Sequence, residues 1–375
     1  MPVLRTPSGS TTMPVPVMTN GQAPLPGAAH IIPYDAVGGV EAAAASCPGG
    51  RYPGFWFRKL YLVSKGAHPP VDSVDHGPCV SESDPRAYVI ALKTLLAARP
   101  RVVIASLWRS CIVLLAYKLL QPGIQAVTFL HSACDVHWLD KAVNRLAMRW
   151  SAEVWTDSLT TLEARVPAAQ RQRARVISMM IDRQPEPQWQ VPEPTFIFWG
   201  RLSREKNLSH ALRLFAQLHG RFPAALFHLV GPDAGDRESL SREAVRLGVA
   251  SRIVFHGPMD QPRIFRLART CSFYLQTSRR EGMAMSVLEA MQLGLVPVVT
   301  AVGEISRYCR DGENGILIGD DAVTVERVGR LLADHQQYRM MAGRAWDTWQ
   351  GQSLYREDVI AGCTRLLEAR QADKP

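Results

Sequence analysis

Short apolar runs of four to six residues recur along the whole chain, and segments with a helical pattern separate them. Runs of this kind, without strict alternation, are typical of strands that are buried on both faces of a parallel sheet. The sequence therefore predicts an α/β fold in which helices cover parallel sheets. The expected strands are 30–33, 60–64, 102–106, 126–130, 154–157 and 175–179, followed by 195–199, 226–230, 252–255, 272–276, 296–299 and 316–317.

A proline-rich stretch divides this pattern into two halves. Residues 182–194 contain four prolines in thirteen positions, which favours an extended linker. A chain of 375 residues is long enough for two domains. We therefore expect two doubly wound, Rossmann-like domains that face each other across a cleft, with ligands at the carboxyl ends of the strands. The expected parts are a disordered tail (1–28), a first domain (29–184), a linker (185–194), a second domain (195–352) and a C-terminal helical segment that could cross back to the first domain (353–375).

The cysteines and the apolar segments indicate the compartment. The seven cysteines are scattered and form no C-x-x-C pair, which argues against a disulfide framework and a structural zinc site. The first 28 residues have no apolar segment of the kind found in secretory signals. No run of eighteen uncharged apolar residues occurs, so no transmembrane span is predicted. We expect a cytoplasmic protein.

The positive charge is concentrated in the first half. Of the residues that give the net charge of +9, 19 Lys and Arg and 12 Asp and Glu fall within residues 1–185. One predicted helix there combines basic residues at four-residue spacing with apolar neighbours: Lys141, Arg145 and Arg149 with Trp138, Leu139 and Trp150. Such a helix can contact anionic lipid headgroups, or it can be a solvated face above core aromatics. No nucleic-acid-binding motif accompanies the charge, so nucleic acid is not expected as a partner.

Two glutamates, Glu281 and Glu289, are separated by seven residues. An expected strand precedes them and an expected helix begins near Ser286, so Glu281 lies at the mouth of a strand-to-helix loop and Glu289 lies inside the helix. Backbone N–H groups at a helix N-terminus form a natural phosphate site. One carboxylate beside it can accept hydrogen bonds from sugar hydroxyls, and the other can hold a ribose. The alternative is that both glutamates are ordinary surface residues.

The segment from Glu281 to Val299 resembles the donor-nucleotide site of the family 4 glycosyltransferases (glycosyl transferases group 1), whose usual form is E-G-F-G-x-x-x-x-E-A-M-A-x-G-x-P-V-V. Two positions depart from this form, since Met283 replaces Phe and Ala284 replaces Gly. A glycine there lets the backbone approach a phosphate or a sugar closely. The resemblance implies that Glu281 is catalytic, and that the donor contacts are Gly282, Met283, Ala284, Met285, Ser286 and Glu289.

A second motif lies about eighty residues upstream. Residues 196–208 are similar to the family's G-R-L-x-x-E-K-G/N segment, and Arg201 and Lys206 match it. The resemblance implies that these two side chains hold the donor diphosphate. A diphosphate leaving group needs cationic partners where no metal neutralises it. Asn207 is the expected N-cap of the following helix.

The first half carries weaker marks. The resemblance implies that Gly39, in a glycine pair after the first strand, brings backbone N–H groups to the donor phosphate; an ordinary flexible turn is the alternative. It implies that His131, after the strand 126–130, contacts the transferred sugar, although a core or capping histidine is also possible. Asp157 ends the next strand and could close the floor of the cleft. In the second half, the resemblance adds Gly257 to the donor site.

The resemblance implies a GT-B fold and a reaction. The chain has no D-x-D motif, so neither a catalytic metal nor another cofactor is expected. The implied enzyme is a retaining glycosyltransferase that moves a hexose from a nucleotide-sugar, expected to be UDP-linked, to a glycan or lipid-linked glycan of surface polysaccharide or lipopolysaccharide synthesis. It would work in the cytoplasm, with a peripheral position at the inner face of the membrane. The alternatives are a soluble synthase with a small free acceptor, and an inactive nucleotide-sugar-binding protein.

Overall fold

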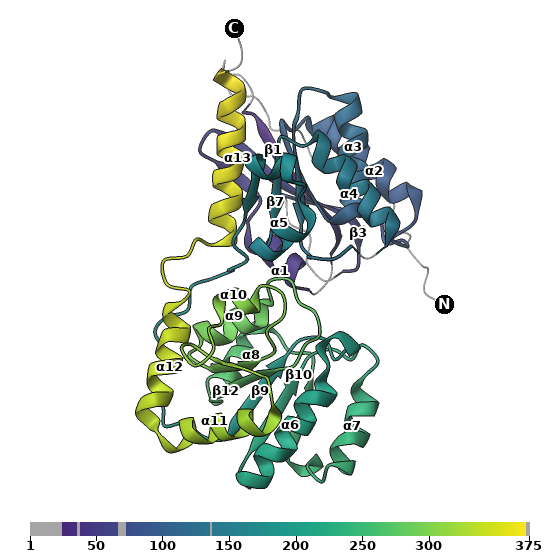
Figure 1. The fold of residues 1–375 in the computed structure, drawn as a ribbon. Helices are drawn as coiled ribbons and strands as arrows, with labels where there is room; N and C mark the ends of the chain where they lie inside the picture. The colour runs from purple at the N-terminus through teal and green to yellow at the C-terminus, as the bar shows by residue number, and fades with distance from the viewer. Residues whose placement is uncertain (1–24, 36–37, 67–72, 136, 373–375) are drawn as a thin grey trace, which may run out of the picture. The chain divides into compact units, whose positions relative to one another are not determined.

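The computed structural model describes residues 25–35, 38–66, 73–135 and 137–372. Within these residues the strands form one sheet of eight strands and one of six. Helices connect most of the strands and lie over the sheets (Figure 1). The expectation of two doubly wound α/β sheets is confirmed.

The first sheet has the order β2-β3-β1-β5-β6-β7-β8, and β4 pairs with β3. The pairs β1–β3, β1–β5, β3–β4 and β5–β6 are parallel, and β2 runs antiparallel to β3. Strand β1 begins at Gly27, inside the predicted tail; the rest of that prediction, up to residue 24, lies outside the described residues. The strands are β1 (Gly27–Asp35), β2 (Gly50–Tyr52), β3 (Phe55–Ser64), β4 (Val74–His76), β5 (Val102–Ser106), β6 (Gln125–Leu130), β7 (Glu153–Thr156) and β8 (Ala174–Val176).

Three helices form a layer on one side of the first sheet: α2 (Pro85–Ala98), α3 (Leu107–Leu120) and α4 (Trp138–Trp150) (Figure 1). Helix α3 lies between the other two and also contacts β1 and β5. Helix α2 begins at Pro85 because proline suits the first turn and the Asp84 side chain accepts a hydrogen bond from the Arg86 amide. The shorter α1 (Gly39–Ser46) follows β1.

The second sheet has six parallel strands in the order β11-β10-β9-β12-β13-β14. The chain starts in the middle, builds outward through β10 and β11, and then returns to the other side of β9. Ligands of such sheets bind where the order reverses, here at the carboxyl ends of β9 and β12. The strands are β9 (Thr195–Trp199), β10 (Leu226–Val230), β11 (Ile253–Gly257), β12 (Phe273–Gln276), β13 (Val296–Val299) and β14 (Ile316–Leu317).

The second sheet is held by a buried aromatic cluster. The rings of Phe196 and Phe273 stack with centroids 5.2 Å apart, and Phe215 in helix α6 (Leu208–Arg221) contacts Phe196 and Phe227. Full burial of such a ring contributes about 1.5–3 kcal/mol. The helices of this half are α5 (Leu159–Arg165), α6 (Leu208–Arg221), α7 (Arg237–Arg246), α8 (Gln261–Ala268), α9 (Met285–Gln292), α10 (Ile305–Tyr308), α11 (Asp321–Ala333) and α12 (His335–Asp347), with single 3₁₀ turns η1 (Ala168–Arg173), η2 (Arg204–Lys206) and η3 (Ala250–Arg252).

The chain divides into two compact units. The first contains the described residues up to 129 together with 137–154 and 359–372, and the second contains 130–135 and 155–358. The units follow the order of the predicted domains but differ in their bounds, because residues 155–184 group with the second unit. The predicted linker has neither helix nor strand, and its Trp189 packs against the second core.

Helix α13 (Tyr355–Ala372) covers the C-terminal segment that was expected to be helical. Its residues from Val359 onward belong to the first unit. There Arg365 donates two hydrogen bonds, of 3.0 and 2.8 Å, to the Glu153 carboxylate at the start of β7. None of the helices in the described part of the chain is both long enough and apolar enough to cross a bilayer.

Candidate functional site

The two sequence motifs meet at the point where the strand order of the second sheet reverses. Lys206 lies in the loop after β9 and Glu281 in the loop after β12, and Lys206 Nζ lies 2.6 Å from Glu281 Oε1. Both side chains are largely shielded from water, with 18% and 9% of their surface exposed. The residues that the resemblance assigned to the diphosphate and to the sugar therefore form an ion pair.

The Glu281 carboxylate is hydrogen-bonded to Gln276, a fully buried residue that ends β12. Gln276 Nε2 donates to Glu281 Oε1 at 3.0 Å, and Gln276 Oε1 accepts from the hydroxyls of Tyr274 and Ser286 at 2.8 and 3.1 Å. Because both hydroxyls donate, they fix which end of the amide faces Glu281. Gln276 was not predicted as a site residue; the signal was a polar residue at the end of an apolar strand, just before the glutamate.

Glu289 also has two defined partners. Its Oε2 accepts from Trp199 Nε1 at 2.8 Å and its Oε1 accepts from Gln261 Nε2 at 2.9 Å. Burial raises the pKa of Glu289, and these two hydrogen bonds oppose that shift. The prediction that Glu289 lies inside the helix is confirmed, since α9 spans it. The alternative of a freely solvated carboxylate does not fit these contacts.

The start of α9 is strained at Ala284. This residue has φ +55° and ψ 64°, the left-handed region that a β-carbon disfavours by about 1–2 kcal/mol. The related motif has a glycine at this position, which accepts the conformation without that cost. Met285 and Ser286 follow in the first turn of the helix, where backbone N–H groups have no partner within the helix.

Residues of the segment after β13 contact the backbone of the β12–α9 loop. A β-carbon added to Gly303, which has φ +58°, would lie 2.3 Å from the Glu281 carbonyl oxygen. The Glu304 amide donates to the Gly282 carbonyl at 3.0 Å, and the Tyr308 hydroxyl donates to the Met283 carbonyl at 3.1 Å. These contacts fix the backbone that carries Glu281. Neither Gly303 nor Tyr308 was predicted as a site residue.

Gly282 borders two residues that follow strands of the first half of the chain. A β-carbon on Gly282 would lie 2.9 Å from Asp157 Oδ2 and 3.3 Å from the His131 carbonyl oxygen. His131 is buried, and its carbonyl oxygen is the atom that lies next to Gly282. Burial raises the pKa of Asp157 to about 6, against hydrogen bonds from Thr161 and Ser158 that lower it. Asp157 is thus a buried carboxyl group next to the loop.

The other predicted residues occupy separate places. Arg201 is exposed two residues after β9, and Gly257 ends β11 with φ +70°. Asn207 does occupy the N-cap position of α6, but the expected side-chain cap is wrong: the residue has φ +50° and its side chain makes no capping bond. Its Oδ1 instead accepts from Arg279 at 3.4 Å. Gly39 begins α1 in the first unit.

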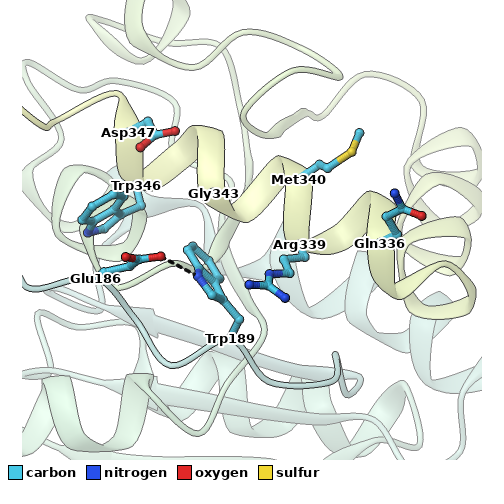
Figure 2. A pocket seen from close by; sticks show the side chains of 8 residues that line it. All are labelled: Glu186, Trp189, Gln336, Arg339, Met340, Gly343, Trp346 and Asp347. Atoms are coloured by element: carbon cyan, nitrogen blue, oxygen red, sulfur yellow. Dashed lines mark hydrogen bonds between the residues drawn. The ribbon is translucent and has the colours of Figure 1, made fainter.

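A cavity of about 300 Å³ lies elsewhere in the second unit (Figure 2). Figure 2 shows Trp189 and Glu186, joined by a hydrogen bond of 3.0 Å, facing residues of α12 such as Arg339 and Trp346. It shares no residue with the group around Glu281. Nor do the described residues contain a group of three or more His, Cys, Asp or Glu side chains that could hold a metal.

Comparison with known proteins gives a family match within the second unit. Residues 181–346 match the family "Glycosyl transferases group 1". Over 92% of this chain and 99% of the other, the structure is similar to Anabaena HepE in complex with UDP (TM-score 0.73, 19% identity). The apo lipopolysaccharide outer core galactosyltransferase WaaB covers the same shares with a TM-score of 0.63 and 17% identity. The fold is the GT-B fold. The residues of this GT-B protein that match the family all lie in its second unit.

Curated relatives match over shorter stretches. The lipopolysaccharide core biosynthesis glycosyltransferase LpsE of Rhizobium meliloti is 29% identical over 180 residues, which are 47% of this chain and 50% of LpsE. The D-inositol 3-phosphate glycosyltransferase of Acidothermus cellulolyticus is 32% identical over 146 residues, 36% of this chain and 33% of that protein. The chain thus spans half or less of the length of these relatives.

Proposed function

We propose that this protein is a retaining, metal-independent glycosyltransferase of family 4, which moves a hexose from a UDP-linked donor to a glycan or lipid-linked glycan. The observation that carries the proposal is the Lys206–Glu281 pair at the reversal point of the second sheet. Two opposite charges held 2.6 Å apart in a shielded place suit a ligand that itself carries a diphosphate beside a sugar.

On donor binding, Lys206 and Arg201 bind the diphosphate together with the N-terminus of α9 and the backbone at Gly257. Lys206 then exchanges Glu281 for a phosphate oxygen, and the charge that builds up on the leaving diphosphate is stabilised without a metal. Glu289 holds the ribose hydroxyls, and the loop from Gly282 to Ser286 lines the diphosphate and sugar.

Glu281 accepts hydrogen bonds from the sugar hydroxyls, with His131 on the other side of the sugar. Partial positive charge develops on the sugar as the glycosidic bond breaks, so a fixed carboxylate stabilises the transition state more than the ground state. The donor phosphate accepts the proton of the acceptor hydroxyl, and the acceptor attacks the face that the diphosphate leaves. The anomeric configuration is then retained.

Three similar proteins support the donor and the acceptor class. HepE has been solved with UDP, with UDP and glucose, and with UDP-glucose, which favours a uridine nucleotide here. LpsE is a lipopolysaccharide core biosynthesis enzyme and WaaB a lipopolysaccharide outer core galactosyltransferase. We therefore propose an acceptor from surface polysaccharide or lipopolysaccharide synthesis. A cytoplasmic protein that meets such an acceptor would work at the inner face of the membrane.

The test incubates the purified protein with radiolabelled UDP-glucose, UDP-galactose and GDP-mannose, with and without EDTA. Donor hydrolysis or transfer that persists in EDTA, and that Lys206→Ala abolishes, is the expected result. Binding of UDP in calorimetry without turnover of any donor would instead identify an inactive nucleotide-sugar-binding protein. Transfer to small free sugars would favour a soluble synthase. The anomeric configuration of the product, read by NMR, decides between retention and inversion.

A further inference from the structure

The helical layer α2–α3–α4 of the first unit exposes an unusual amount of apolar surface. Among the described residues, nine of the sixteen exposed large hydrophobic side chains lie on these three helices. The most exposed are Trp138 (79%) and Leu119 (65%). The three helices contact one another in sequence, so these side chains belong to one continuous layer. The set comprises Val89, Ile90, Ile112, Leu119, Leu120, Trp138, Leu139, Leu146 and Trp150.

The same layer is positively charged. Its three helices carry seven Lys and Arg residues and one acidic residue, Asp140, which is buried. Some of this charge is met locally, because Arg86 pairs with Asp84 and Arg109 lies 3.9 Å from Glu82 in the preceding loop. The basic residues of α4 are exposed, so the positive surface of the layer is centred on that helix.

Helix α4 buries polar side chains and exposes large apolar ones, the reverse of the usual distribution. Its buried face contains Asp140 and Asn144, joined by a hydrogen bond of 2.5 Å, while two tryptophans and two leucines lie on the exposed face. A hydrogen-bonded polar pair is tolerated inside a protein, whereas exposed tryptophan costs free energy in water. An apolar surface of this kind indicates a partner.

The exposed face of α4 is divided into two stripes. Lys141, Arg145 and Arg149 recur at four-residue spacing and form one stripe along the helix. Leu139, Leu146 and Trp150 form a neighbouring stripe. Basic side chains beside tryptophan and leucine are typical of helices that lie in the headgroup region of an anionic bilayer.

We propose that the α2–α3–α4 layer is a membrane-docking surface for bilayers rich in anionic phospholipid. The tryptophans and leucines of α4 enter the headgroup boundary while its basic stripe binds lipid phosphates. A second copy of the chain fits less well, because two such surfaces would bring like charges together. The inference goes beyond glycosyl transfer: it assigns a partner to a face that contains none of the residues proposed to bind the donor.

The experiment measures partition of the full-length protein onto vesicles of phosphatidylcholine with 30% phosphatidylglycerol by flotation, at low and high salt. Each basic residue near an anionic surface contributes about 1 kcal/mol to binding, so the triple variant Lys141→Glu, Arg145→Glu, Arg149→Glu should partition about 100-fold less well. The matched control reverses three arginines on other helices of the second unit, Arg242, Arg246 and Arg339, and should retain most of the binding.

A second arm needs no destabilising change. Vesicles with brominated acyl chains should quench part of the tryptophan fluorescence, and Trp138→Phe, which keeps the side chain apolar, should lose part of that quenching. Circular dichroism melts establish that each variant is folded. No flotation of the unmodified protein at low salt, or equal loss in the α4 and control triples, would overturn the proposal. The proposal would also be overturned if the α4 variants dissociated a dimer of the protein and left its binding to vesicles unchanged. Donor hydrolysis without lipid reports on the proposed function separately.

Discussion

Two regions depart from the usual distribution of side chains, in opposite directions. At the carboxyl edge of the second sheet, the charged side chains of Lys206 and Glu281 are largely shielded from water and form an ion pair. On α4, apolar groups are turned outward, as in Trp138 and Trp150. Shielded charges and exposed tryptophans both cost the folded chain free energy. The difference indicates what each region is suited to bind. The edge of the second sheet suits a small polar ligand, and the exposed face of α4 suits a surface that is both apolar and anionic.

Within the inward region, the largest expected effect separates the two glutamates. Glu281→Gln should lower kcat about 100-fold, because a carboxylate that stabilises charge only in the transition state contributes about 3 kcal/mol. Glu289→Gln should raise KM more than it lowers kcat, since ribose is held equally in the ground and transition states. Steady-state kinetics with the cognate donor measures both. A kcat for Glu281→Gln within about twofold of the unmodified enzyme would remove Glu281 from the chemistry.

The next effect concerns the cations. Lys206→Ala and Arg201→Ala should each weaken UDP binding by about 1.5–3 kcal/mol and leave uridine binding little changed, because a charge-assisted contact to phosphate is lost. Calorimetry with both ligands gives the comparison. Arg204→Ala, an exposed arginine of the same loop, is the control and should change neither. Equal losses for UDP and uridine would mean that these cations do not contact the diphosphate.

The third prediction asks whether burial of the Asp157 carboxyl group lowers the free energy of unfolding at neutral pH. Its folded pKa, about 6, lies above the usual 3.8, so the folded state holds the proton more tightly than the unfolded state. The stability that this gives is present below pH 4 and is lost as the pH rises through 6, by about 2–3 kcal/mol. Asp157→Asn should therefore be more stable than the unmodified protein at pH 7 and gain little at pH 4.

Urea unfolding at pH 4, 5, 6 and 7 measures this difference. Asp347→Asn changes an exposed carboxylate of the same unit and should show no such trend. If the advantage of Asp157→Asn stays constant across this range, Asp157 does not titrate there.

Strands that are buried on both faces could be predicted from the sequence, whereas short, partly buried strands could not. Five strands, among them 195–199 and 226–230, were predicted with the observed bounds, because a strand buried on both faces must be apolar throughout. The three-residue strands β2 and β4 were missed, since they are only partly buried and carry no such run. Fold and donor motifs could be predicted together because both depend on local sequence.

The rest depended on contacts between distant residues. Gln276 and Tyr308 act on the β12–α9 loop through hydrogen bonds that only the folded chain shows. The inverted burial of α4 was likewise ambiguous, because helical spacing shows which residues share a face but not which face points outward. The sequence left both interpretations of that helix open, and the exposure of Trp138 favours the lipid one.

The smallest expected effect tests the strain that positions the inward loop. Ala284 adopts φ +55°, whereas the related motif has glycine. Ala284→Gly removes the clash of the β-carbon, worth about 1–2 kcal/mol, but adds about 0.5–1 kcal/mol of unfolded-state entropy. The net result should be a gain of about 0.5–1 kcal/mol in the free energy of unfolding. Ala290→Gly, in the regular part of the same helix, should instead lose about 1 kcal/mol or more, as glycine does inside helices. Chemical denaturation of the two variants measures both signs, and a loss at both positions would show that Ala284 is not left-handed in solution.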